Sequence, residues 1–403
     1  MTILKSFLMA VLCLAATAIS SPAQTLTTLL NFNGANGASP YASLIQAADG
    51  NFYGTTSTGG TSSACTNGCG TVFQVTPAGA LTTLHSFSGT DGEFPIAKLV
   101  EATDGNFYGT TAFGGSSTNC ASGCGTIFMI TPAGTLSTLH NFVGTDGNGP
   151  NAALIQAADG NLYGITSYGG TNTCTSTPGC GTIFKITLSG ALTTLYNFSG
   201  SDGRNPYGGL VQAKNGKFYG TTQFGGANNG CGTFIGCGTA FSMTRSGALT
   251  TLLSFCAQSG CSDGAVPQTQ LVQGTDGRFY GTTYSGGINS FGTVFSFSAA
   301  GGLRTLHRFI GNDGFDPQEL LAAADGNFYG GATFGGNSSC PSGCGTVFKI
   351  TARGVMTSLH RFHGKDGSNP FGGMLQATSG ELYGTTSFAG ANGDGTFFSL
   401  TVP

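Results

Sequence analysis

Short runs of apolar and β-branched residues alternate with glycine-containing turns along the chain, and the same order of runs returns seven times. The first unit reads Pro40 followed by YASLIQA, an Asp-Gly turn, NFYGTT, a variable loop rich in Gly, Ser and Cys, GTVFQVT, a second turn and ALTTLHSF. Runs of about five to eight residues that are rich in Val, Ile, Thr, Phe and Tyr predict strands, so each unit predicts four. A Tyr-Gly pair marks every unit, at intervals of 49 to 61 residues: Tyr53, Tyr108, Tyr163, Tyr219, Tyr280, Tyr329 and Tyr383.

The turns between the first two runs carry a strong hairpin signal. They read Asp-Gly or Asn-Gly in most units, as at Asp49-Gly50 and Asn215-Gly216, and both central residues of a type I′ turn need a positive φ. Four strands joined up and down make one blade of a β-propeller. The glycine of each Tyr-Gly pair, such as Gly54, falls inside a strand, where it indicates a bulge or the close approach of another backbone.

The two ends of the array share one unit. Residues 25–32 (TLTTLLNF) match the fourth run, whereas residues 395–403 (GTFFSLTVP) stop after a third run. We therefore predict an all-β fold, a seven-bladed β-propeller of four-stranded antiparallel blades, closed by the N-terminal strand pairing into the last blade. Such closure removes the exposed sheet edge that a linear stack would leave. A linear β-solenoid is the alternative, but it gives no reason to divide one unit between the termini.

Three motifs carry a resemblance to a known family. DGNFYGTT, GGxxxxGCGTVFxVTPxG and LTTLHSFxGTDGxxP resemble the GloVer (Gloeo/Verruco) tandem repeats of bacterial exported proteins of the choice-of-anchor type, over residues 25–403. The resemblance implies export but no reaction, because the family carries no agreed activity or catalytic residues. Members often end in a surface-sorting tail, and the absence of one after Thr401-Val402-Pro403 favours release over retention.

The first 23 residues have the pattern of a secretory signal peptide. Lys5 precedes an apolar run, Phe7–Ala18, that is too short to span a bilayer, and Ser21 and Ala23 are small residues at the predicted cleavage site. No later run is long enough to span. We expect residues 24–403 to form a single propeller domain that is secreted to the extracellular space or the periplasm after cleavage near Ala23.

Composition narrows the range of partners. Charged residues make up only 8% of the chain and the net charge is −3, which provides no basic field for nucleic acid. We expect no nucleic-acid partner, no membrane span, no cofactor and a monomer, with an extracellular glycan or protein as the partner.

Twelve cysteines besides Cys13 fall into six close pairs. An even number of cysteines in an exported chain predicts disulfides. Zinc is the alternative, but no histidine flanks a pair at ligand spacing and no C-x-x-C occurs, so we predict no metal site. The pairs are Cys65/Cys69, Cys120/Cys124, Cys174/Cys180, Cys231/Cys237, Cys256/Cys261 and Cys340/Cys344.

Most polar residues that could bind a metal or act in catalysis recur at the same position in several units. An Asp four residues before a Pro recurs in six units, with Asn36 in the seventh place, and we interpret it as a turn rather than a calcium ligand, because each loop offers about one carboxylate where Ca²⁺ needs six to eight oxygens. Four histidines share one position in the fourth run, which indicates a role in packing or on the surface rather than in catalysis. Only His363 is out of phase, so His363, Asp316 and Lys365 are the candidate catalytic group if the protein is an enzyme. The periodic residues are Asp91, Asp146, Asp202, Asp263, Asp313 and Asp366, with His85, His140, His307 and His360.

Aromatic residues near the loops are the better binding candidates. One set precedes the Gly-Gly after the second run, and another follows the proline that begins the first run. Such rings can stack on sugars or anchor a protein partner, whereas the alternative is that they fill space between blades. The candidate ligand-binding residues are Phe113, Tyr168, Phe224, Phe334, Phe388, Tyr41, Tyr207 and Phe371.

Repetition without a unique group of polar residues favours a secreted, disulfide-stapled β-propeller that acts as a binding or interaction scaffold, with its ligand on the loop face. One alternative is an extracellular enzyme that acts on a polysaccharide or other polymer. Another is a purely structural envelope protein. The fold alone does not choose among them, since propellers host both enzymes and binding proteins.

Overall fold

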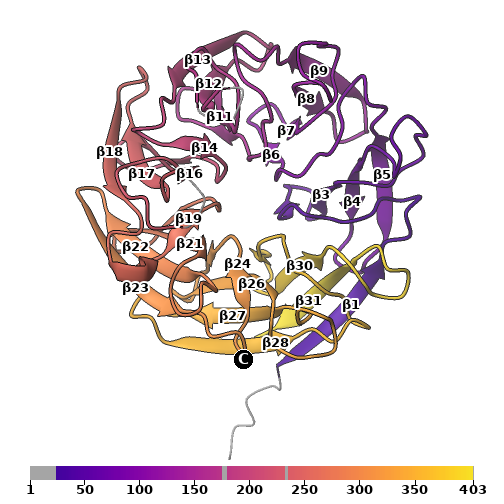
Figure 1. The fold of residues 1–403 in the computed structure, drawn as a ribbon. Coiled ribbons are helices and arrows are strands. Elements are labelled where there is room, and N and C mark those ends of the chain that lie inside the picture. Colours follow the sequence, from indigo (N-terminus) through magenta and orange to yellow (C-terminus); the bar gives the residue numbers. More distant parts are fainter. Residues whose placement is uncertain (1–23, 175–178, 232–234, 403) are drawn as a thin grey trace, which may run out of the picture.

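Seven antiparallel sheets surround a central axis in a ring (Figure 1). The computed structural model describes residues 24–174, 179–231 and 235–402, so the predicted signal peptide, residues 1–23, lies outside the described residues. The predicted seven-bladed, four-stranded architecture is confirmed.

The strands of each blade run outward from the axis in chain order. Blade 1 has β2 (Ile45–Gln46), β3 (Phe52–Thr56), β4 (Thr71–Val75) and β5 (Leu81–Ser86). Blade 2 has β6 (Val100–Glu101), β7 (Phe107–Thr111), β8 (Thr126–Ile130) and β9 (Leu136–Asn141). Blade 3 has β10 (Ile155–Gln156), β11 (Leu162–Thr166), β12 (Thr182–Ile186) and β13 (Leu192–Asn197).

Blades 4 to 6 each have an additional short strand before the innermost one. Blade 4 has β14 (Arg204–Pro206), β15 (Val211–Gln212), β16 (Phe218–Phe224), β17 (Thr239–Met243) and β18 (Leu249–Ser254), followed by a short 3-10 helix, η1 (Ser259–Cys261). Blade 5 has β19 (Ala265–Pro267), β20 (Val272–Gln273), β21 (Phe279–Ser285), β22 (Thr293–Ser298) and β23 (Gly301–Arg308). Blade 6 has β24 (Phe315–Pro317), β25 (Leu321–Ala322), β26 (Phe328–Phe334), β27 (Thr346–Ile350) and β28 (Met356–Arg361).

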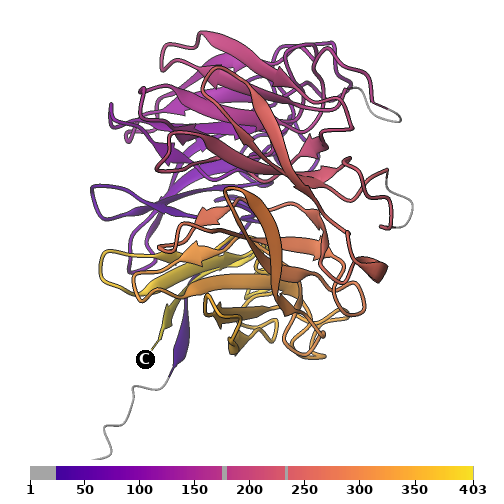
Figure 2. The ribbon, with the colours of Figure 1, turned by 90° about the vertical axis from the view of Figure 1, so that its left-hand side faces the viewer.

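Blade 7 is built from both ends of the described chain. Its strands are β29 (Leu375–Gln376), β30 (Leu382–Thr386), β31 (Thr396–Thr401) and β1 (Thr25–Asn31). β1 pairs antiparallel with β31 from Thr25 opposite Thr401 to Asn31 opposite Thr396, and Figures 1 and 2 both place the start of β1 beside the C-terminal end. The predicted closure is confirmed: β1 is the outermost strand of blade 7 and covers the edge of β31 that would otherwise be unpaired.

The innermost strand is shorter than the apolar run that predicts it. In blade 1 only Ile45 and Gln46 pair with β3, whereas the residues between Pro40 and Leu44 leave the ladder. The freed backbone faces the axis, where it forms the wall of the central cavity described below.

The glycine inside β3 makes room for side chains rather than for a backbone, which corrects the expectation from the sequence. A Cβ on Gly54 would lie 2.7 Å from a methyl carbon of Leu44 and 2.8 Å from Cζ of Phe73. In each of the other six blades, the Phe equivalent to Phe73 approaches the equivalent glycine, together with a Leu or, in blade 7, Met374. The Phe ring therefore fills the centre of each blade only because this position lacks a side chain.

Tyrosine of the Tyr-Gly pair joins each blade to the next. The Tyr53 ring stacks on Phe107 of blade 2, with ring centroids 4.2 Å apart, and Tyr219 stacks on Phe279 at 4.0 Å. Each hydrophobic cluster of this kind draws residues from two adjacent blades. Paired rings contribute about 0.5–1.5 kcal/mol beyond the area that they bury, so the repeat sets the contact between blades.

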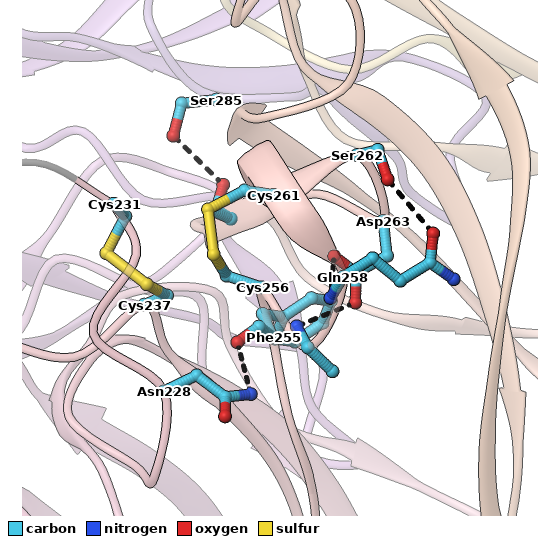
Figure 3. Close-up of a disulfide and its surroundings, with 12 residues drawn as sticks. Asn228, Cys231, Cys237, Phe255, Cys256, Gln258, Cys261, Ser262, Asp263 and Ser285 are labelled. Atoms are coloured by element: carbon cyan, nitrogen blue, oxygen red, sulfur yellow. Dashed lines mark hydrogen bonds between the residues drawn. A yellow bond between two sulfur atoms is a disulfide. The ribbon is translucent and has the colours of Figure 1, made fainter.

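Six disulfides close short loops: Cys65–Cys69, Cys120–Cys124, Cys174–Cys180, Cys231–Cys237, Cys256–Cys261 and Cys340–Cys344. Five of them lie between the second and third strands of a blade. Cys256–Cys261 instead lies in the connection between blades 4 and 5 and packs beside Cys231–Cys237 (Figure 3). Among the described residues, no helix has the length and apolar character needed to cross a membrane.

Candidate functional site

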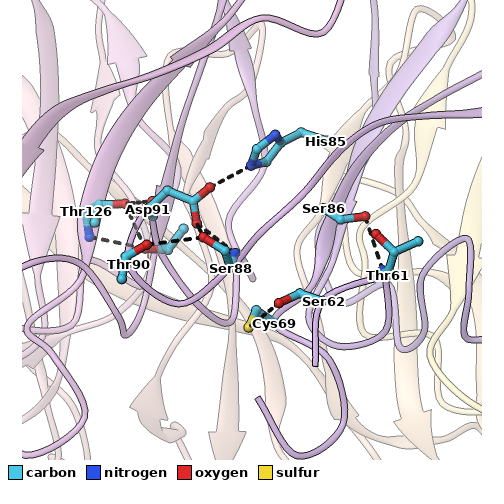
Figure 4. Close-up of polar contacts among 10 residues, drawn as sticks. Thr61, Ser62, Cys69, His85, Ser86, Ser88, Thr90, Asp91 and Thr126 are labelled. Atoms are coloured by element: carbon cyan, nitrogen blue, oxygen red, sulfur yellow. Dashed lines mark hydrogen bonds and ion pairs between the residues drawn. The ribbon is translucent and has the colours of Figure 1, made fainter. Parts of the chain in front are cut away.

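The loops between second and third strands and the connections between blades lie on one face of the ring, which we call the loop face. The periodic Asp of each connection holds a turn, as predicted: Asp91 Oδ1 accepts a hydrogen bond from the Ser88 backbone N–H at 2.8 Å. Its other oxygen, Oδ2, lies 2.8 Å from Nε2 of His85 (Figure 4). Burial acts to raise the pKa of Asp91, but the hydrogen bonds from His85 and Ser88 outweigh it and hold the pKa below its usual value.

Four blades contain this His–Asp pair, which sequence reasoning missed. The signal was a constant spacing of six residues, and in blade 3 Tyr196 takes the place of the histidine beside Asp202. The histidine position is therefore set by a partner as well as by packing. The pairs are His85–Asp91, His140–Asp146, His307–Asp313 and His360–Asp366.

A strained backbone joint precedes the proline of every blade. The seven residues at this position all have positive φ, although the region is unfavourable for residues other than glycine and a following proline restricts it further. The N–H of Phe94 donates to the Cys69 carbonyl at 3.1 Å, and the other joints make the same bond to the loop of the preceding blade. The positive φ costs about 1–3 kcal/mol at each of these positions other than Gly149, and the backbone bond and the surrounding packing offset that cost. The seven residues are Ser39, Phe94, Gly149, Asn205, Val266, Asp316 and Asn369.

Each joint turns the next residues toward the axis. A cavity of about 110 Å³ is lined by residues of all seven blades and therefore lies on the axis; we call its opening the channel mouth. Glu319 in the wall of this cavity accepts a hydrogen bond from the Ser43 hydroxyl at 2.6 Å, and Lys98 also lines the wall. The residues that follow the prolines form a mouth ring of aromatic, amide and aliphatic side chains: Tyr41, Ile96, Asn151, Tyr207, Gln268, Gln318 and Phe371.

Aromatic side chains continue from the mouth ring across the loop face. Tyr41 contacts Phe371, Phe388 and Phe94, with centroid separations of 4.7, 6.1 and 6.2 Å. Phe94 and Phe113 are 5.8 Å apart, and Phe371 leads through Phe334 and Phe315 to Phe291. We call these rings the aromatic arc: Phe113, Phe94, Tyr41, Phe388, Phe371, Phe334, Phe315 and Phe291.

The structure places five of the eight predicted ligand-binding residues in this arc: Phe113, Phe334, Phe388, Tyr41 and Phe371. Tyr207 lines the same cavity as Tyr41 and Phe371, and burial raises its pKa. Tyr168 is exposed on the loop face. Phe224 is half-buried under the Arg204 guanidinium, whose carbon lies 5.6 Å from the ring centroid.

Three members of the arc were missed from the sequence. Phe94 and Phe315 lie inside the D-G-x-x-P segment, so their position relative to Asp and Pro was an available signal. Phe291 lies in the loop between β21 and β22, where blade 5 has no cysteine. These residues join the two predicted aromatic sets into one surface.

The candidate catalytic residues have separate partners. Asp316 is buried at a strained joint and accepts a hydrogen bond from Gln268 Nε2 at 3.2 Å. Burial raises the pKa of Asp316 to about 7, against hydrogen bonds that act to lower it. His363 is exposed beside Asp366, and Lys365 is also exposed. Among the described residues, no hydrogen bond or ion pair joins Asp316 to His363 or Lys365.

Seven sheets in a ring, with six disulfides in their loops, define the chain as a disulfide-containing seven-bladed β-propeller. A sequence model of the Gloeobacter/Verrucomicrobia repeat matches residues 17–176, 62–236 and 232–403. The chain therefore belongs to the Gloeobacter/Verrucomicrobia repeat family, in agreement with the resemblance of its motifs. No curated protein matches the sequence.

Solved structures share the fold at low sequence identity. The extracellular domain of a candidate hybrid two-component system from B. thetaiotaomicron is 13% identical with a TM-score of 0.55, and the match covers 93% of this chain and 41% of that one. A candidate 6-phosphogluconolactonase from Bacteroides fragilis is 18% identical with a TM-score of 0.51, over 79% of this chain and 84% of that one. Identities this low show the fold alone.

Proposed function

We propose that the protein is a secreted binding scaffold that holds an extracellular glycan across the loop face, over the channel mouth. The aromatic arc is the observation that carries this proposal, because it brings eight rings from five blades into one continuous surface. Exposed rings at its edges include Phe113 and Phe388, which are 41% and 39% exposed. Disulfides support the assignment to an oxidising compartment outside the cytoplasm.

The chemistry of the mouth ring favours a sugar. Flat rings can stack on the apolar faces of sugar rings, and the neutral amides of Asn151 and Gln268 also line the mouth, where amides can bond to hydroxyls. Gln318 is buried, and its Nε2 donates to the Asp316 carbonyl and the Thr333 hydroxyl. The axial cavity, at about 110 Å³, is smaller than the roughly 300 Å³ of a typical ligand pocket. A glycan would therefore lie across the mouth, with at most a small group inserted into it.

One observation supports a second candidate, an enzyme that acts on a polymer. Asp316 combines burial, a raised pKa and contact with Gln268, which lines the mouth. A carboxyl group that titrates near neutral pH is suited to general acid–base catalysis. Against it, the described residues place no second titratable group in contact with Asp316. A purely structural envelope protein would bind no soluble glycan at all.

Glycan-array binding of the purified exported protein, followed by calorimetry with the best polysaccharide, tests the proposal. We expect Tyr41→Ala to weaken binding roughly thirtyfold, because losing an anchoring aromatic side chain costs about 2 kcal/mol. Tyr284→Ala is the matched control, since Tyr284 is 46% exposed but lies outside the arc. Equal losses in both variants, or no binding to any glycan, would contradict the proposal. Product release that Asp316→Asn abolishes would favour the enzyme.

A further inference from the structure

Blade 6 differs from the other blades with a His–Asp pair by one additional histidine. His360 Nε2 lies 2.7 Å from Asp366 Oδ2, as in the other pairs, but His363 Nδ1 also faces the same oxygen at 3.6 Å. Ser88, Val143 and Ile310 stand at the position of His363 in the other three pairs. Two imidazoles and one carboxylate thus converge on one point of the loop face.

These three groups are arranged as metal ligands. Their ligating atoms all lie within 4.8 Å of one another. Zinc binds His nitrogen and carboxylate oxygen at about 2.0–2.2 Å, so two ligands at a tetrahedral angle are roughly 3.3 Å apart. The separations of 2.7 and 3.6 Å bracket that value. Small side-chain rotations are therefore enough to place all three around one ion.

The surroundings hold the carboxylate while leaving the site open. Asp366 Oδ1 accepts a hydrogen bond from the His363 backbone N–H at 2.8 Å, which fixes the side chain and leaves Oδ2 for a ligand. His360 packs on the buried Phe362 ring, with centroids 4.9 Å apart. His363 is 61% exposed, so an ion can enter from solvent and keep a position for water or another ligand.

We propose that His360, His363 and Asp366 form a binding site for a divalent transition-metal ion, Zn²⁺ in the first instance. Two nitrogen ligands suit Zn²⁺, Ni²⁺ or Cu²⁺ and disfavour Ca²⁺ and Mg²⁺, which require oxygen ligands. The sequence analysis predicts no metal site, because it assigns the periodic histidines to packing or surface and does not pair His360 with Asp366. The other metal-ligand grouping, Cys237, Cys256 and Cys261, consists of disulfide-bonded cysteines and supplies no thiolate.

Calorimetric titration of the metal-free exported protein with Zn²⁺ tests the site, with Co²⁺ absorption as a spectroscopic check on nitrogen ligation. We expect one Zn²⁺ per chain. His363→Ser, which installs the residue found in blade 1, should weaken Zn²⁺ binding at least tenfold while leaving the circular dichroism spectrum and thermal unfolding unchanged. Ca²⁺ should not compete.

A gain-of-site variant makes the test independent of loss of folding. Val143 N–H donates to Asp146 Oδ1 at 2.8 Å, as His363 N–H does to Asp366, and Val143 is 40% exposed beside the His140–Asp146 pair. Val143→His should therefore raise the stoichiometry from one Zn²⁺ to two. Unchanged Zn²⁺ affinity in His363→Ser, or a stoichiometry that stays at one in Val143→His, would overturn the proposal.

Discussion

The Tyr53 hydroxyl donates a hydrogen bond to Asp49 Oδ2 at 2.8 Å, across the hairpin turn between β2 and β3. Asp49 Oδ1 accepts from the Asn51 backbone N–H at 3.0 Å, so one carboxylate holds both the turn and the tyrosine. The pair explains the spacing in DGNFYG. Tyr108, Tyr163, Tyr280 and Tyr329 donate to an Asp in the same way, and Tyr383 donates to Glu381.

Removing one such hydroxyl should destabilise the fold measurably. We expect Tyr53→Phe to lower the free energy of unfolding by about 1.5–3 kcal/mol, the range for a hydrogen bond to a charged group, while the ring stack on Phe107 remains. Urea unfolding measures the change. Tyr284→Phe is the control, because Tyr284 is exposed, and an equal loss there would contradict this assignment.

Alkaline pH should act on the same hydroxyls. Burial, with the Asp49 hydrogen bond and charge, raises the pKa of Tyr53 to about 12, above the unfolded value of about 10. The neutral phenol is therefore the stabilised form: its contribution is complete below pH ~10 and is lost as the pH rises toward ~12. Spectrophotometric titration should show Tyr53-type residues ionising after exposed tyrosines, with stability falling over that interval. A single transition near pH 10 would refute this.

A methyl group at the centre of a blade should be tolerated poorly. Because a Cβ on Gly54 would lie within 3 Å of both Leu44 and Phe73, we expect Gly54→Ala to cost about 1–3 kcal/mol, the usual range for overpacking. Phe73→Leu should make room for that methyl group. In a double-mutant cycle by chemical unfolding, Gly54→Ala should cost less in the Phe73→Leu background. Additive costs would show that Phe73 is not the obstacle.

The local disulfides should each stabilise the chain modestly. A closed loop of about five residues gives roughly 2 kcal/mol in the chain-entropy description, so we expect Cys65→Ser with Cys69→Ser to lower the free energy of unfolding by about that amount. Mass spectrometry of the unreduced protein should find only local pairs and no free thiols in the exported chain. A bridge between distant blades would contradict the pairing.

Much of the fold could be predicted because its information is local and repeated. The hairpin at Asp49-Gly50 and the division of one blade between β1 and β31 follow from adjacent residues or from counting units. The predicted type I′ turn is wrong, however, because Gly50 has a positive φ and Asp49 does not. The His85–Asp91 pair could not be predicted in this way. A bulge in β5, opposite Val72 and Phe73, shifts the register of β5 against β4, so simple alternation misplaces the side chains beyond it. The positive φ of Phe94 was equally hidden, because a residue before proline ordinarily avoids that region.

The backbone bonds at the joints before the prolines have a consequence for ligand specificity. Backbone bonds, rather than side chains, fix where Tyr41, Asn151 and Gln268 emerge around the opening. Under the proposed function, substitution at these places would change which ligand the opening accepts while the backbone bonds that assemble the ring stay in place. Specificity would then be adjustable one blade at a time.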